Sequence, residues 1–222
     1  MRGLVRWVAA AAGLGTLLLT RSCITQGDPP APRGDEGQGG EVAVSDLGFY
    51  LGDPSAPLQI VEFTDPSCPY CADFHQAARA ELFDEFVVTG RARWVTIPWE
   101  SDQYPNSMLA VIAVECAPDP ATAERVTEAL YADRDRWVGA PSSAAEAVIR
   151  EAAAGAGIEG AALDRCETDQ DLLARIDAAD SLATALGVRG TPTYLIDGFP
   201  MMGAVPFSFA RRAFDARLAE LQ

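Results

Sequence analysis

The chain has 222 residues and a formal net charge of -15. This acidity argues against a protein that neutralises nucleic-acid phosphates or binds anionic lipid. Five cysteines are too few for a small disulfide-rich scaffold, but they are enough for one redox or metal motif and one structural bridge. The basic residues other than His75 are all arginine, which excludes lysine chemistry such as a Schiff base. The length fits one domain, or one domain with a large insertion.

Residues 1–22 have the pattern of a targeting segment, which we expect to be a signal peptide or a membrane anchor. Arg2 and Arg6 precede an apolar run that is short for a membrane-spanning helix. Cys23 follows in a context that resembles a lipidation signal, although Arg21 departs from that pattern. Lipidation of Cys23, ordinary cleavage nearby and an uncleaved anchor all remain open. Each of them places the rest of the chain outside the cytoplasm, where disulfides persist.

Residues 23–42 are rich in proline, glycine and charge and hold almost no large apolar side chain. Such a composition buries too little apolar surface to offset the entropy of ordering the chain. We therefore expect a disordered linker here, followed by a single domain over residues 43–222.

An apolar run at residues 57–64 predicts a buried strand, and helix-forming residues with apolar spacing follow from residue 72. The motif Cys68-Pro69-Tyr70-Cys71 therefore lies at a strand-to-helix junction, and Pro69 suits the first helical turn. Free backbone N–H groups and the helix dipole would stabilise a Cys68 thiolate. We expect Cys68 to be the exposed nucleophile and Cys71, one turn further, to be the buried resolving cysteine.

Two other interpretations of this cysteine pair are an inert disulfide and half of a zinc site. Zinc sites usually need a second closely spaced pair of ligands. The remaining cysteines are single and far apart, and His75 is the sole histidine. The pattern thus favours a redox-active pair without a metal.

Two further features surround this motif. Glu62 interrupts the apolar strand six residues before Cys68, and it is either a solvated edge residue or a group that exchanges a proton with Cys71. Thr191-Pro192 precedes a short strand, and spacing alone leaves both a cis and a trans peptide bond open.

Residues 103–187 predict a helical insertion, with helices over 121–137, 142–154 and 159–186. Cys116 and Cys166 occupy apolar positions in it, and they either form a structural disulfide or remain two unpaired core cysteines. Acidic residues outnumber arginines in this segment. They form either a solvated surface or a face that selects partners.

The segments GDPSAPLQIVEFTDPSCPYC and LGVRGTPTYLIDG resemble the bacterial DsbA-like proteins of the thioredoxin superfamily, over about residues 42–222. The resemblance implies an α/β thioredoxin fold with a helical insertion between the CxxC helix and the cis-Pro strand. It implies an acidic residue at the position of Glu62, and a cis peptide bond at Pro192. It places Thr191, Pro192, Pro69 and Tyr70 beside the substrate.

The same resemblance implies an exported, periplasmic or tethered enzyme that introduces disulfides into unfolded or reduced exported proteins. A membrane redox partner would restore its disulfide, and we expect no cofactor, no nucleic-acid partner and a monomer. The dipeptide between the cysteines is Pro-Tyr, whereas the best-known oxidases of the family carry Pro-His. The direction therefore stays open to a reductase or isomerase, and a non-catalytic tethered holdase is a further alternative.

Overall fold

The computed structural model describes residues 44–221. The expected signal peptide or anchor (1–22), the linker (23–42) and Cys23 lie outside the described residues, so these expectations remain predictions. Within the described part of the chain, every helix is too short or too polar to cross a membrane.

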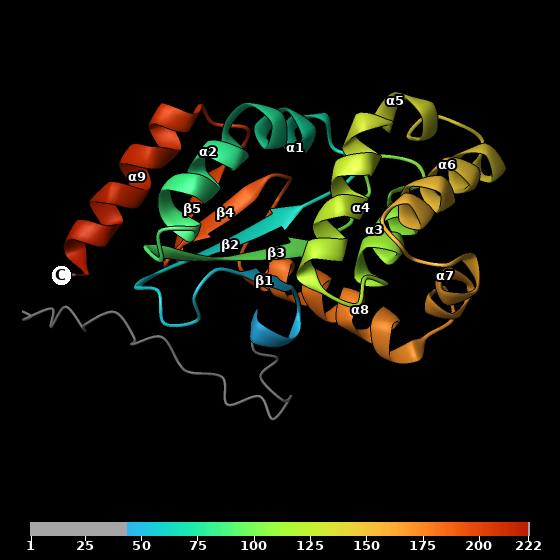
Figure 1. The fold of residues 1–222 in the computed structure, drawn as a ribbon, viewed down its shortest axis with the longest axis horizontal. Coiled ribbons are helices and arrows are strands. Elements are labelled where there is room, and N and C mark those ends of the chain that lie inside the picture. Colours follow the sequence, from blue (N-terminus) through green and yellow to red (C-terminus); the bar gives the residue numbers. More distant parts are fainter. Residues whose placement is uncertain (1–43, 222) are drawn as a thin grey trace, which may run out of the picture. The chain divides into compact units, whose positions relative to one another are not determined.

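Five strands form one mixed sheet in the order β1-β3-β2-β4-β5 (Figure 1). The central β2 pairs in parallel with β3, and the other pairings are antiparallel. β2 is buried along almost its whole length, as the apolar run at 57–64 predicts. The strands are β1 (Phe49–Leu51), β2 (Leu58–Thr64), β3 (Ala92–Pro98), β4 (Thr193–Ile196) and β5 (Phe199–Met202).

One face of the sheet is covered by the helix that follows the CxxC motif and by α9 (Phe207–Glu220). The first of these is one continuous helical segment, in which regular turns alternate with wider π-helical turns. Leu58, Ile60 and Trp94 project from the strands into this layer, and Phe86 and Phe214 meet them from the helices. The segment consists of α1 (Pro69–Phe74), η2 (His75–Arg79), α2 (Ala80–Leu82) and η3 (Phe83–Val87).

The opposite face of the sheet is covered by α8 (Gln170–Ala185) and the short 3-10 turn η1 (Val44–Asp46). Val61 and Phe63 alternate along β2 with the residues of the first face, as a strand buried on both sides requires. Ala179 and Ala183 of α8 pack against them. The sheet is therefore a central layer between helices, and the expected α/β fold with a helical insertion is confirmed.

The insertion forms a helical layer with a core of its own beside the sheet (Figure 1). Trp137 is fully buried in this core, and its indole N–H donates to the Leu130 carbonyl at 2.9 Å. The prediction of one helix over 159–186 is wrong, because Asp169 caps a new helix by accepting from the backbone N–H groups of the next turn. The helices of the insertion that precede α8 are α3 (Ser107–Glu115), α4 (Pro120–Ala132), α5 (Arg134–Trp137), α6 (Ser142–Gly155) and α7 (Gly160–Cys166).

Candidate active site

Cys68 is the N-cap residue of α1, and Pro69 occupies the first helical position. The Cys68 thiol lies 3.3 Å from the Thr191 carbonyl oxygen, to which it donates. The pKa of Cys68 is lowered from its ordinary value of 9.0 to about 6, chiefly by a hydrogen bond from the Cys71 side chain. The Thr191 side chain and the backbone N–H groups of Cys71 and Tyr70 add to this effect against the opposing influence of burial. The helix N-terminus thus favours the thiolate, as the placement of the motif predicts.

The expectation that Cys68 is exposed is wrong, because only 3 % of its surface is accessible. Tyr104 and Tyr131 of the insertion pack against the two cysteines and Ala72. The exposed residue of the motif is Tyr70, at 60 %. Covering side chains from a distant part of the chain are invisible to a local pattern, which explains the error.

Cys71 lies one turn into α1 and is also buried. Burial raises its pKa well above the ordinary value, and the neighbouring Cys68 sulfur adds to the effect. Both thiols are free in this structure. The pair therefore combines one sulfur that ionises readily with one that holds its proton, which is the arrangement expected of a nucleophile and a resolving thiol.

The peptide bond between Thr191 and Pro192 is cis, as the resemblance implies. Thr193, the first residue of β4, donates from its hydroxyl to the Gly190 carbonyl at 2.7 Å and so closes the preceding turn. This turn brings the Thr191 carbonyl against Cys68. Residues more than a hundred positions apart thereby form one site.

Glu62 lies on β2 and is only 4 % exposed, so the interpretation as a solvated edge residue is wrong. The Trp94 indole N–H donates to its carboxylate at 2.9 Å, and Arg79 Nε lies 3.8 Å from the same oxygen. Burial raises the pKa of Glu62, and the Arg79 guanidinium and Trp94 indole oppose that rise. Burial therefore makes this carboxyl group easier to protonate than an exposed glutamate.

Arg79 belongs to this site although no local pattern identifies it. It is buried in η2 and reaches both carboxylate oxygens of Glu124 on α4, at 2.5 and 2.6 Å. Its guanidinium also lies 4.1 Å from the centre of the Phe83 ring. One cation therefore joins β2, the active-site helix and the insertion.

Asp65, just after β2, organises the loop that leads to Cys68. Its buried carboxylate accepts from the Ser67 backbone N–H and the Ser107 hydroxyl, both at 2.8 Å, and from the Ser101 hydroxyl at 2.7 Å. Arg134 of the insertion donates to the Ser67 carbonyl at 2.7 Å. The sequence Asp-Pro-Ser after a strand is a signal for such a side-chain turn, and it could have identified Asp65.

His75, Glu124 and Glu128 place their donor atoms within 4.8 Å of one another, which is the geometry of a possible cation site. The Arg79 guanidinium already binds both Glu124 oxygens, however. Burial, followed by Arg79, lowers the pKa of His75 to about 4, and its ring lies against Tyr131 with centroids 5.3 Å apart. We assign no metal to this group, because both Glu124 oxygens are already bound by Arg79.

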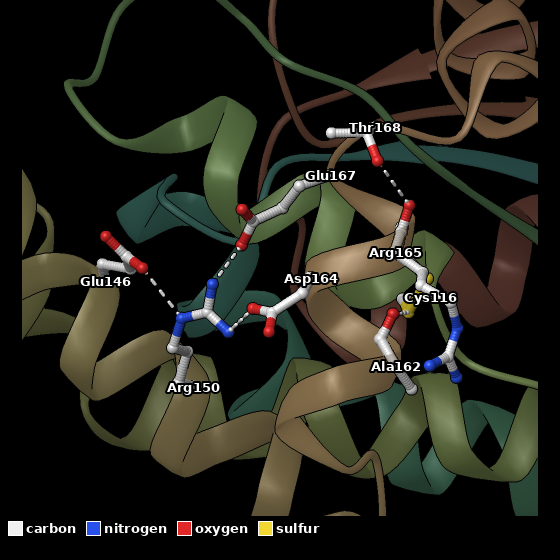
Figure 2. Close-up of polar contacts among 9 residues, drawn as sticks. Cys116, Glu146, Arg150, Ala162, Asp164, Arg165, Glu167 and Thr168 are labelled. Carbon is white, nitrogen blue, oxygen red and sulfur yellow. Dashed lines mark hydrogen bonds and ion pairs between the residues drawn. A yellow bond between two sulfur atoms is a disulfide. The ribbon is translucent and has the colours of Figure 1, made fainter.

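The second cysteine pair lies away from this site. Cys116 and Cys166 are joined by a disulfide between the end of α3 and the end of α7. Figure 2 shows this bridge beside a cluster of surface ion pairs, in which the Arg150 guanidinium contacts three carboxylates. The three partners are Glu146, Asp164 and Glu167.

Comparisons with known proteins agree with this geometry. A family model described as thioredoxin matches residues 45–216. A Rickettsia conorii protein that is provisionally named a protein-disulfide oxidoreductase is 23 % identical over 156 residues, which are 70 % of this chain and 55 % of that protein. The chain thus spans about half the length of the curated relatives it matches.

Two solved structures have the same fold. α-DsbA1 of Wolbachia pipientis superposes with a TM-score of 0.67 at 18 % identity, over 78 % of this chain and 92 % of that one. DsbA of Chlamydia trachomatis gives 0.62 at 22 % identity, over 78 % and 92 %. The chain belongs to the thioredoxin family, and its fold is that of the DsbA proteins.

Proposed function

We propose that the chain is a thiol–disulfide oxidoreductase that acts as a dithiol oxidase, with Cys68 and Cys71 as its redox pair. The observation that carries this proposal is the position of Cys68 at the N-terminus of α1, against the cis-Pro turn. Hydrogen bonds from the Cys71 thiol and from the backbone N–H groups at this helix start stabilise the thiolate and therefore the reduced form of the protein. A disulfide whose reduced form is stabilised is a stronger oxidant.

In the proposed reaction a substrate thiolate attacks Cys68 in the Cys68–Cys71 disulfide. A bond forms between the substrate sulfur and Cys68, and Cys71 leaves as a thiolate that takes up a proton, for which Glu62 is the proposed donor. A second substrate thiolate then attacks the substrate sulfur of the mixed disulfide and releases Cys68 as a thiolate. The substrate gains one disulfide, and the protein keeps the two electrons as a dithiol.

The substrate chain is proposed to lie along the cis-Pro turn, with its backbone beside Thr191 and Pro192. Pro69 and the exposed Tyr70 border the same place. Because Cys68 is buried in a cluster with Tyr104 and Tyr131, we propose that a substrate displaces one of these rings to reach the sulfur. The insertion would in this way restrict access to the nucleophile.

We further propose that the protein is exported and acts on unfolded or reduced exported proteins, and that a membrane redox partner restores its disulfide. The Cys116–Cys166 disulfide supports this location, because structural disulfides persist mainly outside the cytoplasm. The fold shared with DsbA proteins supports thiol–disulfide exchange as the reaction, and the direction rests on the stabilised Cys68 thiolate.

The test is oxidative refolding of a reduced substrate with two thiols, with the redox potential measured against glutathione. We expect the oxidised protein to accelerate disulfide formation, with a potential on the oxidising side of the range from about -270 to -120 mV. A value near -270 mV, together with reduction of disulfides, would assign a reductase instead. Suppression of aggregation that is unaffected by Cys68→Ser would assign a holdase.

A further inference from the structure

Tyr194 of β4 buries a hydroxyl group that the packing of the core does not use. The residue is 0 % exposed, and its ring packs between Phe74 and Trp94, with centroids 4.8 and 6.1 Å away. Its hydroxyl makes no hydrogen bond of ordinary length to any residue between 44 and 221. A phenylalanine would fill the same space without the penalty of burying an unpaired hydroxyl. The oxygen atom therefore calls for an explanation other than packing.

The sheet places this hydroxyl beside the proposed proton donor. Glu62 on β2 and Tyr194 on β4 are direct partners in the antiparallel register. Side chains of directly opposed residues lie on the same face of a sheet, with Cβ atoms about 4.5–5.5 Å apart. This face lies under α1, and Phe74, which contacts the Tyr194 ring, follows Cys71 in α1 by nearly one turn. The phenol thus lies between Glu62 and the helix that carries Cys71.

The electrostatic surroundings agree with that position. Burial raises the pKa of Tyr194 well above its usual range, and the charges of Glu62 and Cys71 raise it further. The phenol therefore keeps its proton at neutral pH, and its pKa depends on the charges of both groups. The charges of Cys71 and Glu62 also raise the pKa of Tyr131, but its hydroxyl forms a hydrogen bond with the Thr64 hydroxyl at 2.8 Å. Of these two tyrosines, Tyr194 is the one whose hydroxyl lacks a partner at ordinary hydrogen-bond length and interacts with Glu62, whose pKa it lowers.

We propose that the Tyr194 hydroxyl carries the proton between Cys71 and Glu62. When Cys71 must become a nucleophile, its S–H bond breaks and the phenol oxygen takes that proton, directly or through one bridging water. The O–H proton of Tyr194 passes to the Glu62 carboxylate at the same time, so the negative charge moves from Glu62 to the Cys71 sulfur. The reverse transfer protonates Cys71 as it leaves the disulfide. This inference rests on the proposed function.

The test is Tyr194→Phe, which removes the oxygen and keeps the ring. Reduced protein is mixed with glutathione disulfide and quenched at intervals, and the glutathionylated intermediate is followed by mass. Cys68 forms the mixed disulfide in the first step, and Cys71 resolves it in the second. We expect the variant to keep the first rate and to slow the second by about a hundredfold, the range of general acid–base catalysis. Its second rate should then rise with hydroxide concentration where the wild-type rate is flat.

Three comparisons make the result specific. Tyr50→Phe removes another unpaired hydroxyl, from the opposite side of the sheet, and should leave both steps unchanged. Tyr194→Phe added to Glu62→Gln should slow the second step no further than Glu62→Gln alone, because both groups serve one transfer. The melting temperature of Tyr194→Phe should equal or exceed that of the wild type.

A second step with the wild-type rate and pH profile in Tyr194→Phe would overturn the inference and leave the proposed function intact. Independent, multiplicative slowing in the double variant would overturn it as well. If the wild-type protein forms no mixed disulfide with glutathione, the proposed function fails, and this inference fails with it.

Discussion

The two cysteine pairs of this chain occupy regions of opposite physical character. Cys68 and Cys71 are free thiols at a helix N-terminus, beside a buried carboxyl group and a buried guanidinium. Cys116 and Cys166 form a disulfide between two helices of the insertion, near the surface ion pairs of Arg150, with the buried Glu115 paired to Arg175 beside Cys116. The first region perturbs the pKa of both sulfurs, whereas the second joins two elements. The surroundings of the two cysteine pairs therefore distinguish the proposed redox site from the structural bridge.

The arginines of the two regions show the same difference. Arg79 is buried between Glu62 and Glu124, where charges interact strongly and an unpaired one is unfavourable. Arg150 contacts three carboxylates, but all of them are partly exposed, and water weakens such pairs. The number of ion pairs is thus a poor guide to their importance, and burial is a better one.

The largest expected effect separates the two pairs by activity. Cys68→Ser should reduce disulfide exchange to the uncatalysed background, because no other described sulfur lies at a helix N-terminus with a free thiol. Cys116→Ala combined with Cys166→Ala should retain activity at temperatures where it is folded. Oxidative refolding of a reduced substrate measures both. Equal loss of exchange activity in Cys68→Ser and in the double alanine variant would contradict the proposed division into a redox pair and a structural pair.

The next effect is on the ionisation of Cys68. Its pKa of about 6 lies three units below the ordinary value of 9.0, about a thousandfold in the dissociation constant. Thiolate absorbance of the reduced protein should rise with a midpoint near pH 6, and Cys68→Ser should lack this transition. Because the folded pKa is depressed, the reduced protein should gain stability as pH rises from about 6 to 9 and lose it as pH falls through 6. A midpoint near 8.5 would refute the proposed stabilisation.

Arg79→Met tests the buried network. It leaves Glu62 and Glu124 buried without their cation, and we expect unfolding to become easier by about 3–5 kcal/mol. The pKa of Glu62 should rise further, since the guanidinium opposes its rise in the native protein. Denaturant unfolding measures the first effect, and the pH profile of the second exchange step measures the other. Arg79→Lys keeps the charge, and its free energy of unfolding should lie between those of the wild type and Arg79→Met.

Removal of the insertion disulfide should lower the free energy of unfolding by no more than Arg79→Met does. Closing a loop between residues 50 positions apart contributes about 4 kcal/mol in the chain-entropy model. For the double alanine variant this corresponds to a decrease of about 10 °C in melting temperature. Calorimetry of the variant beside wild type that keeps the Cys116–Cys166 bridge, both with Cys68 and Cys71 reduced, checks the value. An unchanged melting temperature would show that the bridge does not stabilise the fold.

The smallest effect is expected for Arg150→Met. Despite its three ion pairs (Figure 2), the loss should not exceed about 1 kcal/mol, because exposed pairs contribute little. It should shrink further in high salt. A loss as large as that of Arg79→Met would contradict the difference drawn between buried and exposed charge.

The sequence predicts the elements whose signals are local. The apolar run of β2, the proline after Cys68 and the glycines of the insertion identify the strand, the helix start and several helix ends. The cis bond at Pro192 is predicted by family resemblance and not by spacing, because base rates favour trans.

Local signals could not reveal contacts made across long separations. The cover over Cys68 depends on Tyr104 and Tyr131, which enter from the insertion. The pairing of Arg79 with Glu124 joins residues 45 positions apart. In the sequence, both look like charged residues on the exposed face of an ordinary helix. Tyr194 has the pattern of a core residue, and its place opposite Glu62 follows from the strand register and not from any local signal.

The most direct test of the division between the two pairs is equilibration of the native protein in glutathione buffers of graded potential, followed by alkylation and peptide mass analysis. We predict that Cys68–Cys71 passes from disulfide to dithiol between about -120 and -270 mV, while Cys116–Cys166 stays oxidised throughout. Reduction of Cys116–Cys166 at the same or a higher potential than Cys68–Cys71 would contradict the account.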